Sequence, residues 1–148
     1  MLISLASLSD IDDIMSFINS NFKENHILSR NKSFFEYEHR HKNNINFIIA
    51  KDENKIVAIL GFIQTSFKDT YDVFTVMWKV MENNKTPLLG IRLLKFLEDL
   101  KGVRNVLSTG INTKTIGIYK YLNMYTDKLN QYAIINRQLK NYKIAYNK

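Results

Sequence analysis

The feature that most constrains the fold is a long strand followed, after a short loop, by a helix. Residues Tyr71–Val80 are rich in β-branched and aromatic residues, which is typical of a strand. Thr86 and Pro87 then read as an N-cap followed by the first helical position, where proline is best tolerated. The helix stops at Gly102 and carries apolar residues at helical spacing: Leu89, Leu93, Phe96, Leu97 and Leu100.

This junction predicts a site for an anion. The first N–H groups of a helix have no partner within the helix, and the helix dipole adds positive potential at the same point. Strict alternation along the preceding strand would place one set of side chains on a single face: Asp72, Phe74, Val76 and Trp78.

The other expected elements follow from periodicity and turn residues. Two apolar runs around the polar turn Lys51–Asn54 predict a hairpin. Ser9 reads as the start of a helix over Asp10–Phe22. The remaining expected elements are a strand at Leu2–Leu5, a helix at Asn31–His41, strands at Asn46–Ala50, Lys55–Ile63 and Arg104–Thr109, a helix at Asn112–Leu122 and a closing strand at Gln131–Arg137.

The order of these elements predicts an α/β fold. Three consecutive strands before a strand–helix–strand unit indicate a mixed sheet with helices on both faces. A length of 148 residues fits one domain. We expect that domain to cover residues 1–138, followed by a polar basic tail at 139–148.

Charge and composition narrow the classes of function. The net charge is +7, and residues 101–148 hold 9 basic residues against the single acid Asp127. Such a one-sided field favours an anionic partner, such as a phosphorylated cofactor. The chain has no cysteine, which excludes disulfides, thiolate metal sites and a cysteine nucleophile. No long apolar run or leader stands out, so we expect a cytoplasmic protein without membrane contact.

Two motifs resemble the GNAT (GCN5-related N-acetyltransferase) superfamily. The family's loop pattern Arg/Gln-x-x-Gly-x-Gly/Ala corresponds to residues 85–90, with Leu88 in place of the first glycine and Gly90 at the second small position. The second motif is Asn112 followed by a helix ending Tyr119-Lys120-Tyr121-Leu122, with Asn123 where glycine is usual. The resemblance implies a central, mostly antiparallel sheet of about six to seven strands.

The resemblance also implies acetyl-CoA as the acyl donor, with no metal. Backbone amides of residues 85–90 would hold the pyrophosphate, and the end of the long strand would pair with the pantetheine arm. We read Leu88 as a sign of tighter packing in this loop. The residues expected to contact the cofactor are Trp78, Val80, Lys85, Thr86, Leu88, Leu89, Gly90, Arg92 and Asn112.

The same resemblance suggests the catalytic groups. Tyr119 stands where family members place a general acid that protonates the leaving thiolate. The base that deprotonates the amine is open between His26, Asp72, Glu24, Glu82 and a water relay. His39 and His41 are two apart, a spacing that does not put both on one helix face, so no metal site is expected.

Local strings resemble a GNAT subgroup found with surface-polysaccharide genes, which implies an amino sugar, free or nucleotide-linked, as the small-molecule acceptor. Three strings carry this likeness: 26–28, 56–62 and 129–132. Two other functions stay open. One is an inactive coenzyme A-binding module, because Leu88 and Asn123 replace glycines. The other is nucleic-acid binding by the basic C-terminal segment, which should show steep salt dependence. A homodimer is also compatible with the sequence.

Overall fold

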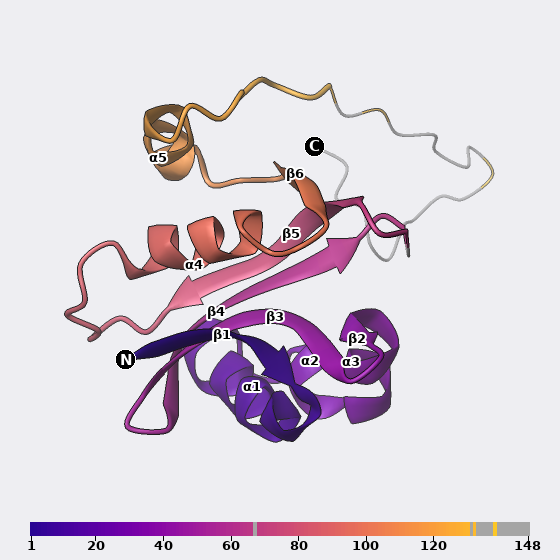
Figure 1. Ribbon diagram of the computed structural model, residues 1–148, viewed down its shortest axis with the longest axis vertical. Coiled ribbons are helices and arrows are strands. Elements are labelled where there is room, and N and C mark those ends of the chain that lie inside the picture. The colour runs from indigo at the N-terminus through magenta and orange to yellow at the C-terminus, as the bar shows by residue number, and fades with distance from the viewer. Residues whose placement is uncertain (67, 131, 133–137, 139–148) are drawn as a thin grey trace. The chain divides into compact units, whose positions relative to one another are not determined.

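The computed structural model describes residues 1–66, 68–130, 132 and 138 (Figure 1). They fall into two compact units, one from Met1 to Gly110 and one that begins at Ile111, and each is described by itself. The expected closing strand at Gln131–Arg137 falls, except for Tyr132, outside the described residues, as does the tail at 139–148. The single domain expected over residues 1–138 stays a prediction.

The first unit is built on a six-stranded mixed sheet, which confirms the expected fold class. Neighbouring strands run antiparallel except for the parallel pair β5–β6. The order is β1-β3-β4-β5-β6, with the short β2 beside β3. The strands are β1 (Leu2–Ser7), β2 (Arg40–His41), β3 (Asn44–Asp52), β4 (Lys55–Gln64), β5 (Tyr71–Val80) and β6 (Val103–Ser108).

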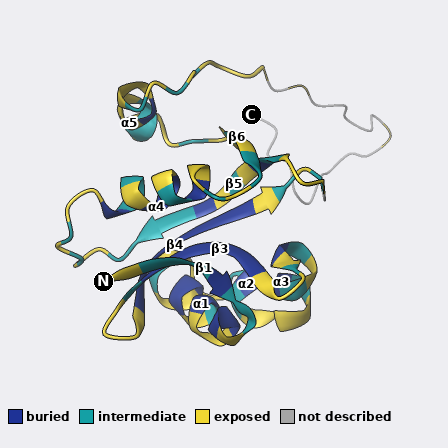
Figure 2. Ribbon diagram, in the orientation of Figure 1, coloured by how far each residue is buried: buried dark blue, intermediate teal, exposed yellow. Residues whose placement is uncertain are grey.

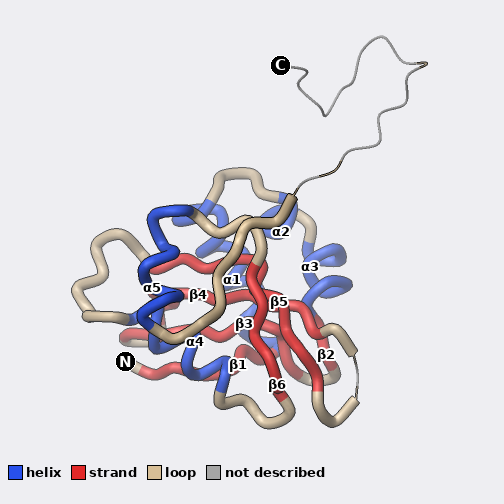
Figure 3. Tube along the Cα trace, turned by 90° about the horizontal axis from the view of Figure 1, so that it is seen from above, coloured by secondary structure: helices blue, strands red, loops and turns tan. Residues whose placement is uncertain are grey.

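Helices lie on both faces of this sheet, as expected. Figures 1 and 3 show α1, α2 and α3 on one side of the strands and α4 on the other. The helices of the first unit are α1 (Ile11–Phe17), with the 3-10 turn η1 (Leu8–Asp10) before it and the π-helical turn η2 (Ile18–Phe22) after it, then α2 (Ile27–Arg30), α3 (Lys32–His39) and α4 (Leu89–Glu98). The second unit contains η3 (Thr113–Thr115) and α5 (Ile116–Tyr121).

The core is divided between the two faces by the alternation of strand residues. On β3, Ile45, Phe47 and Ile49 pack into the cluster formed with α1–α3, while Ile48 and Ala50 are buried on the α4 side. Helix α4 buries a leucine stripe against the sheet: Leu89, Leu93, Leu94 and Leu97. Figure 2 shows that burial is almost continuous along β3 and β4.

A β-bulge interrupts the alternation in β5. Gly61 lies opposite Met77 and Phe62 lies opposite Thr75, so Val76 is an extra residue in β5. The alternation of side chains between the two faces of the sheet is therefore reversed after the bulge. Asp72 faces the α1–α3 side, whereas Trp78 faces the α4 side. The expectation that both share one face was wrong, because it assumed an uninterrupted strand.

Several element boundaries also differ from the sequence predictions. Helical structure begins before the expected Ser9, because Ser7 is the N-cap of η1 and Asp10 that of α1. The backbone N–H and hydroxyl of Ser7 both donate to Asp10 Oδ2, at 2.8 and 2.7 Å. The hairpin turn is shorter than expected, with only Glu53 and Asn54 between β3 and β4, both at positive φ. Helix α2 was not predicted at all.

Candidate active site

The pairing between β5 and β6 stops halfway along β5. The last paired residues are Thr75 and Ser108, while β5 continues to Val80. At this point Thr75 Oγ1 donates to the Leu107 carbonyl at 3.4 Å and lies within hydrogen-bond distance of Ser108 Oγ. The bulge at Val76 follows immediately. The second half of β5 thus extends past its parallel neighbour, which leaves a strand edge where an extended ligand can pair.

Helix α4 begins beyond this part of β5, after a loop that ends in a left-handed residue. Leu88 is the N-cap, with φ 56° and ψ 22°, and its side chain is 67% exposed. The expected cap Thr86 instead lies in the loop, where its N–H donates to Asn84 Oδ1 at 2.9 Å. The expectation of tighter packing around Leu88 was also wrong, because the side chain points into solvent.

Gly90 allows Trp78 to pack closely on the start of α4. A Cβ at Gly90 would lie 3.1 Å from Trp78 Nε1 and 3.3 Å from Cζ2. Such contacts would force the indole to move. Trp78 and Val80 both point to the α4 face, since they lie opposite Leu60 and Ala58. The structure therefore brings the expected residues Trp78, Leu88, Leu89 and Gly90 together.

The start of α4 is electropositive. The first turn of the helix carries no acidic residue that would offset its dipole. Arg92 lies one turn into the helix and Lys85 lies in the loop before it, and both are exposed. The nearby Lys79 Nζ is 3.2 Å from Glu82 Oε1, an exposed pair. This combination of helix dipole and cations favours a phosphate group.

Asp72 lies in the paired half of β5, inside a compact polar cluster. Its Oδ1 accepts from Arg104 Nε at 2.9 Å and from Asn105 Nδ2 at 2.8 Å, and its Oδ2 accepts from Arg104 Nη2 at 2.8 Å. The hydrogen bonds from Arg104 and then Asn105 hold the pKa of Asp72 below its ordinary value. This arrangement stabilises the carboxylate and makes Asp72 a weak base.

His26, the other candidate base, is the N-cap of α2. Its Nδ1 accepts a hydrogen bond from Leu28 N at 3.2 Å, and its ring meets Phe22 edge-on at 5.8 Å between centroids. Because Nδ1 is an acceptor here, the proton of the neutral ring lies on Nε2.

The second unit holds Asn112 and Tyr119. Asn112 caps η3, because its Oδ1 accepts from Lys114 N at 3.0 Å. Tyr119 is buried in α5. The helix ends with Asn123 at φ 58°, with hydrogen bonds from Asn123 N to the Lys120 carbonyl and from Met124 N to the Tyr119 carbonyl. This is the Schellman pattern, in which a left-handed residue closes the helix.

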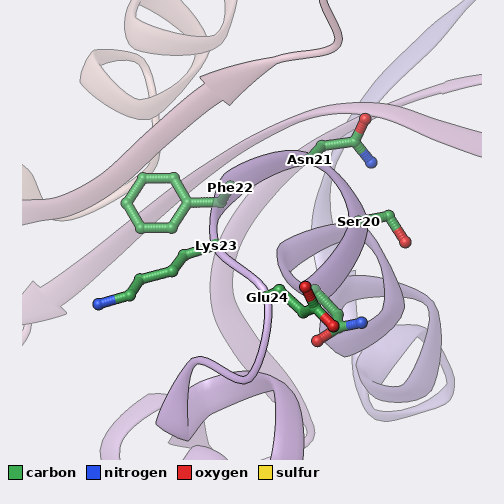
Figure 4. A pocket seen from close by; sticks show the side chains of 6 residues that line it. Ser20, Asn21, Phe22, Lys23 and Glu24 are labelled. Carbon is green, nitrogen blue, oxygen red and sulfur yellow. The ribbon is translucent and has the colours of Figure 1, made fainter.

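Two shallow hollows lie beside the end of α1. The larger, about 430 Å³, is formed by the consecutive residues 19–24. Figure 4 shows Phe22 and Lys23 pointing to one side of this segment while Ser20, Asn21 and Glu24 point elsewhere. The smaller, about 220 Å³, lies between α1 and the β3–β4 turn. Both open widely to solvent, so neither encloses a ligand.

The described residues give no sign of a metal centre or a membrane span. Within the ranges that the structure covers, no three His, Cys, Asp or Glu side chains lie together as metal ligands would. Across the same ranges, no helix has the length and apolar character needed to cross a bilayer.

Sequence reasoning missed the bulge at Val76 and the contact between Thr75 and Ser108. Neither has a local signal, because a bulge depends on the register between two strands. The sequence placed the cap of α4 at Thr86, two residues before the observed cap Leu88, and it left the catalytic base open among several groups that included His26 and Asp72. Their different partners appear only when the strands and helices are assembled.

Comparison with known proteins gives a consistent result for the fold. No family model matches the sequence, and no curated protein matches it significantly. Solved structures do match. A possible acetyltransferase from Clostridium difficile 630 is 16% identical, with a TM-score of 0.64, over 91% of this chain and 97% of the other. An aminoglycoside acetyltransferase from an uncultured soil metagenomic sample is 13% identical, with a TM-score of 0.63, over 92% and 100%.

A third similar structure contains a ligand. AAC(6')-Iy, in complex with the bisubstrate analogue CoA-S-monomethyl-acetylneamine, is 10% identical, with a TM-score of 0.66, over 91% of this chain and 98% of the other. At such low identity the likeness concerns the fold. The mixed six-stranded sheet with helices on both faces is therefore a fold that this chain shares with these solved acetyltransferase structures.

Proposed function

We propose that this protein is an N-acetyltransferase that moves an acetyl group from acetyl-CoA to a primary amine. The observation that supports this most strongly is the half of β5 that extends beyond β6, with the electropositive start of α4 following it along the chain. An extended amide-containing arm can pair with a strand edge, and a diphosphate fits a helix start.

The residues around this site fit coenzyme A. The side chain of Leu88 is exposed, and the first N–H groups of α4 have no partner within the helix. Lys85, Thr86, Leu89 and Gly90 would surround the pyrophosphate, with Arg92 adding positive charge. Val80 and Trp78 would flank the pantetheine arm.

The chemistry follows from the groups available. The acceptor nitrogen attacks the thioester carbonyl carbon, the C–S bond breaks, and the thiolate takes a proton. A backbone N–H of β5 past the bulge would stabilise the charge on the carbonyl oxygen. Tyr119 is the proposed proton donor. Since Asp72 is held by Arg104 and His26 Nδ1 by its cap, the proton of the amine leaves through water.

We propose an amino sugar as the acceptor class, on the basis of the sequence resemblance. The aminoglycoside acetyltransferase with a similar fold supports a small-molecule amine in general. A cytoplasmic location and a homodimer belong to the same proposal and follow from the sequence expectations.

The intrinsic fluorescence of Trp78 provides the test, because it is the only tryptophan in the chain and packs on Gly90. We expect titration with coenzyme A to change this signal. Arg92→Glu should weaken binding by roughly tenfold, since it reverses a charge beside the phosphate. Lys95→Glu, an equally exposed change on the same helix, is the matched control. Thiol release with an amine panel then separates an enzyme from a binding module, which would bind without turnover.

A further inference from the structure

Three apolar side chains form an exposed row across strands β4, β5 and β6. Ile63 of β4 lies opposite Phe74 of β5, which in turn lies opposite Leu107 of β6. Residues that are opposite in register share a face, so the three side chains line up across adjacent strands. Their exposed fractions are 37%, 37% and 39%.

The row lies on the face that carries α1–α3, but these helices do not cover it. Gly61, two residues before Ile63, is covered on this face by the ring of Phe47, where a Cβ would come within 2.7 Å of Cζ. Phe47 belongs to the buried cluster of α1–α3, and the row does not. A solvated sheet face usually carries polar residues, so three aligned apolar ones need an explanation.

The row ends at the place proposed for acetyl transfer. Phe74 and Leu107 form the pair just before Thr75 and Ser108, where the pairing of β5 and β6 stops. The bulge residue Val76, which is 44% exposed, follows on β5. An acceptor that reaches the thioester from this face would therefore lie over the row.

The charge around the row disfavours a polycation. Asp72 is the only acidic residue in strands β4, β5 and β6. Both of its oxygens are used by Arg104 and Asn105 on the same face. An acceptor with several ammonium groups would find no available carboxylate on these strands, while one with an apolar surface can displace water from the row.

We propose that this row selects the acceptor, a primary amine that carries one positive charge on a body with an apolar face. The inference rests on the proposed acetyl transfer to a primary amine, and it describes the acceptor by its charge and its apolar face without assuming an amino sugar. Two sources share this chemistry: an amino-deoxysugar, whose C–H face can lie on Phe74, and an arylalkylamine.

The test measures thiol release with three acceptors: a nucleotide-linked amino-deoxysugar, phenethylamine and kanamycin. We expect kcat/KM for one of the first two to exceed that for kanamycin by at least about tenfold, and the preferred one identifies the source. Phe74→Ser and Leu107→Ser should each raise KM for that acceptor by roughly tenfold, because apolar contact is lost. Tyr37→Ser, at an exposed aromatic on α3, should leave KM unchanged.

The outcomes separate this inference from the proposed function. A preference for kanamycin, or unchanged KM in both variants with coenzyme A binding intact, would overturn the inference alone. Absence of any coenzyme A response at Trp78 would overturn the proposed function and the inference with it. If the serine variants do not fold, Ile63→Thr, a small change suited to a strand, carries the same expectation.

Discussion

The two ends of the sheet differ in how their strands are used. In β3 and β4 nearly every residue is buried, whereas β5 buries only Val73 and Met77, and β6 has no fully buried residue. The first end lies between helices on both faces, and the second keeps an exposed apolar row and an unmatched strand half. The strands that supply most of the buried core are thus different from the strands that carry the proposed ligand site.

The largest expected effect tests this contrast directly. Phe47 is fully buried and stacks on Phe35 at 5.4 Å between ring centroids. Phe47→Ala should lower the free energy of unfolding by about 3–5 kcal/mol, because it leaves a cavity. Phe74→Ala, the matched truncation at the other end, should cost no more than about 1 kcal/mol. If urea denaturation shows equal losses of unfolding free energy for the two variants, the two ends of the sheet do not differ in their contribution to stability.

A second prediction uses a buried histidine in the stable end. His39 lies between Phe35 and Phe47, and neither ring nitrogen makes a hydrogen bond of good geometry among the described residues. Burial lowers the pKa of His39 to about 4, and the backbone of Phe62 offsets only part of this. Glu38 is close enough to pair with a charged His39, with Oε2 at 3.7 Å from Nε2.

The sign of the pH effect follows from these values. Between about pH 6.5 and pH 4 the unfolded chain binds a proton at His39 that the folded chain does not, so stability falls as pH falls. We expect a loss of about 3 kcal/mol across this window. His39→Leu should remove most of that slope in urea titrations at several pH values. An equal slope in the variant would show that other groups cause it.

A third prediction separates activity from stability in the second unit. Tyr119→Phe should lower kcat at least about tenfold, because the thiolate loses its proton donor. The coenzyme A response of Trp78 should stay nearly the same. Single-turnover thiol release measures the rate of acetyl transfer, and fluorescence titration measures the affinity for coenzyme A. Unchanged turnover would remove Tyr119 from the mechanism.

The smallest expected effect concerns the loop before α4. Leu88 has a left-handed backbone and an exposed side chain, so Leu88→Gly relieves strain without loss of packing. The gain is offset in part by the greater freedom of glycine in the unfolded chain, which leaves a net stabilisation of up to about 1 kcal/mol. Asn123→Gly should change stability by less than about 0.5 kcal/mol, because asparagine adopts this conformation easily. Thermal unfolding of both variants tests whether Leu88→Gly stabilises the protein more than Asn123→Gly does.

The sequence predicted the elements whose signals are local. The β3–β4 hairpin and β5 have continuous apolar runs with clear turns. Helix α3 lies within its expected range, and it begins after the cap Asn31, whose Oδ1 accepts from Phe34 N at 3.0 Å. The start of α4 was placed at Thr86, because a threonine before proline usually caps a helix. In the structure the helix begins after the left-handed residue Leu88 instead. Leucine has no preference for this conformation, so the sequence gives no signal for such a turn.

The candidate site was predicted only in part, for a related reason. The start of α4 and the end of β5 are adjacent in sequence, so their association was visible. The partners of Asp72 come from β6, more than thirty residues later, and depend on register. The apolar row likewise joins three strands through pairings that the sequence does not encode locally.

Leu88 and Asn123 have a consequence for how this fold can diversify. Both stand where the related pattern has glycine, and both keep a positive φ. What these two turns demand is a torsion angle, and more than one amino acid can supply it at a modest energetic cost. A chain can therefore form such a turn without the glycine by which the motif is usually recognised.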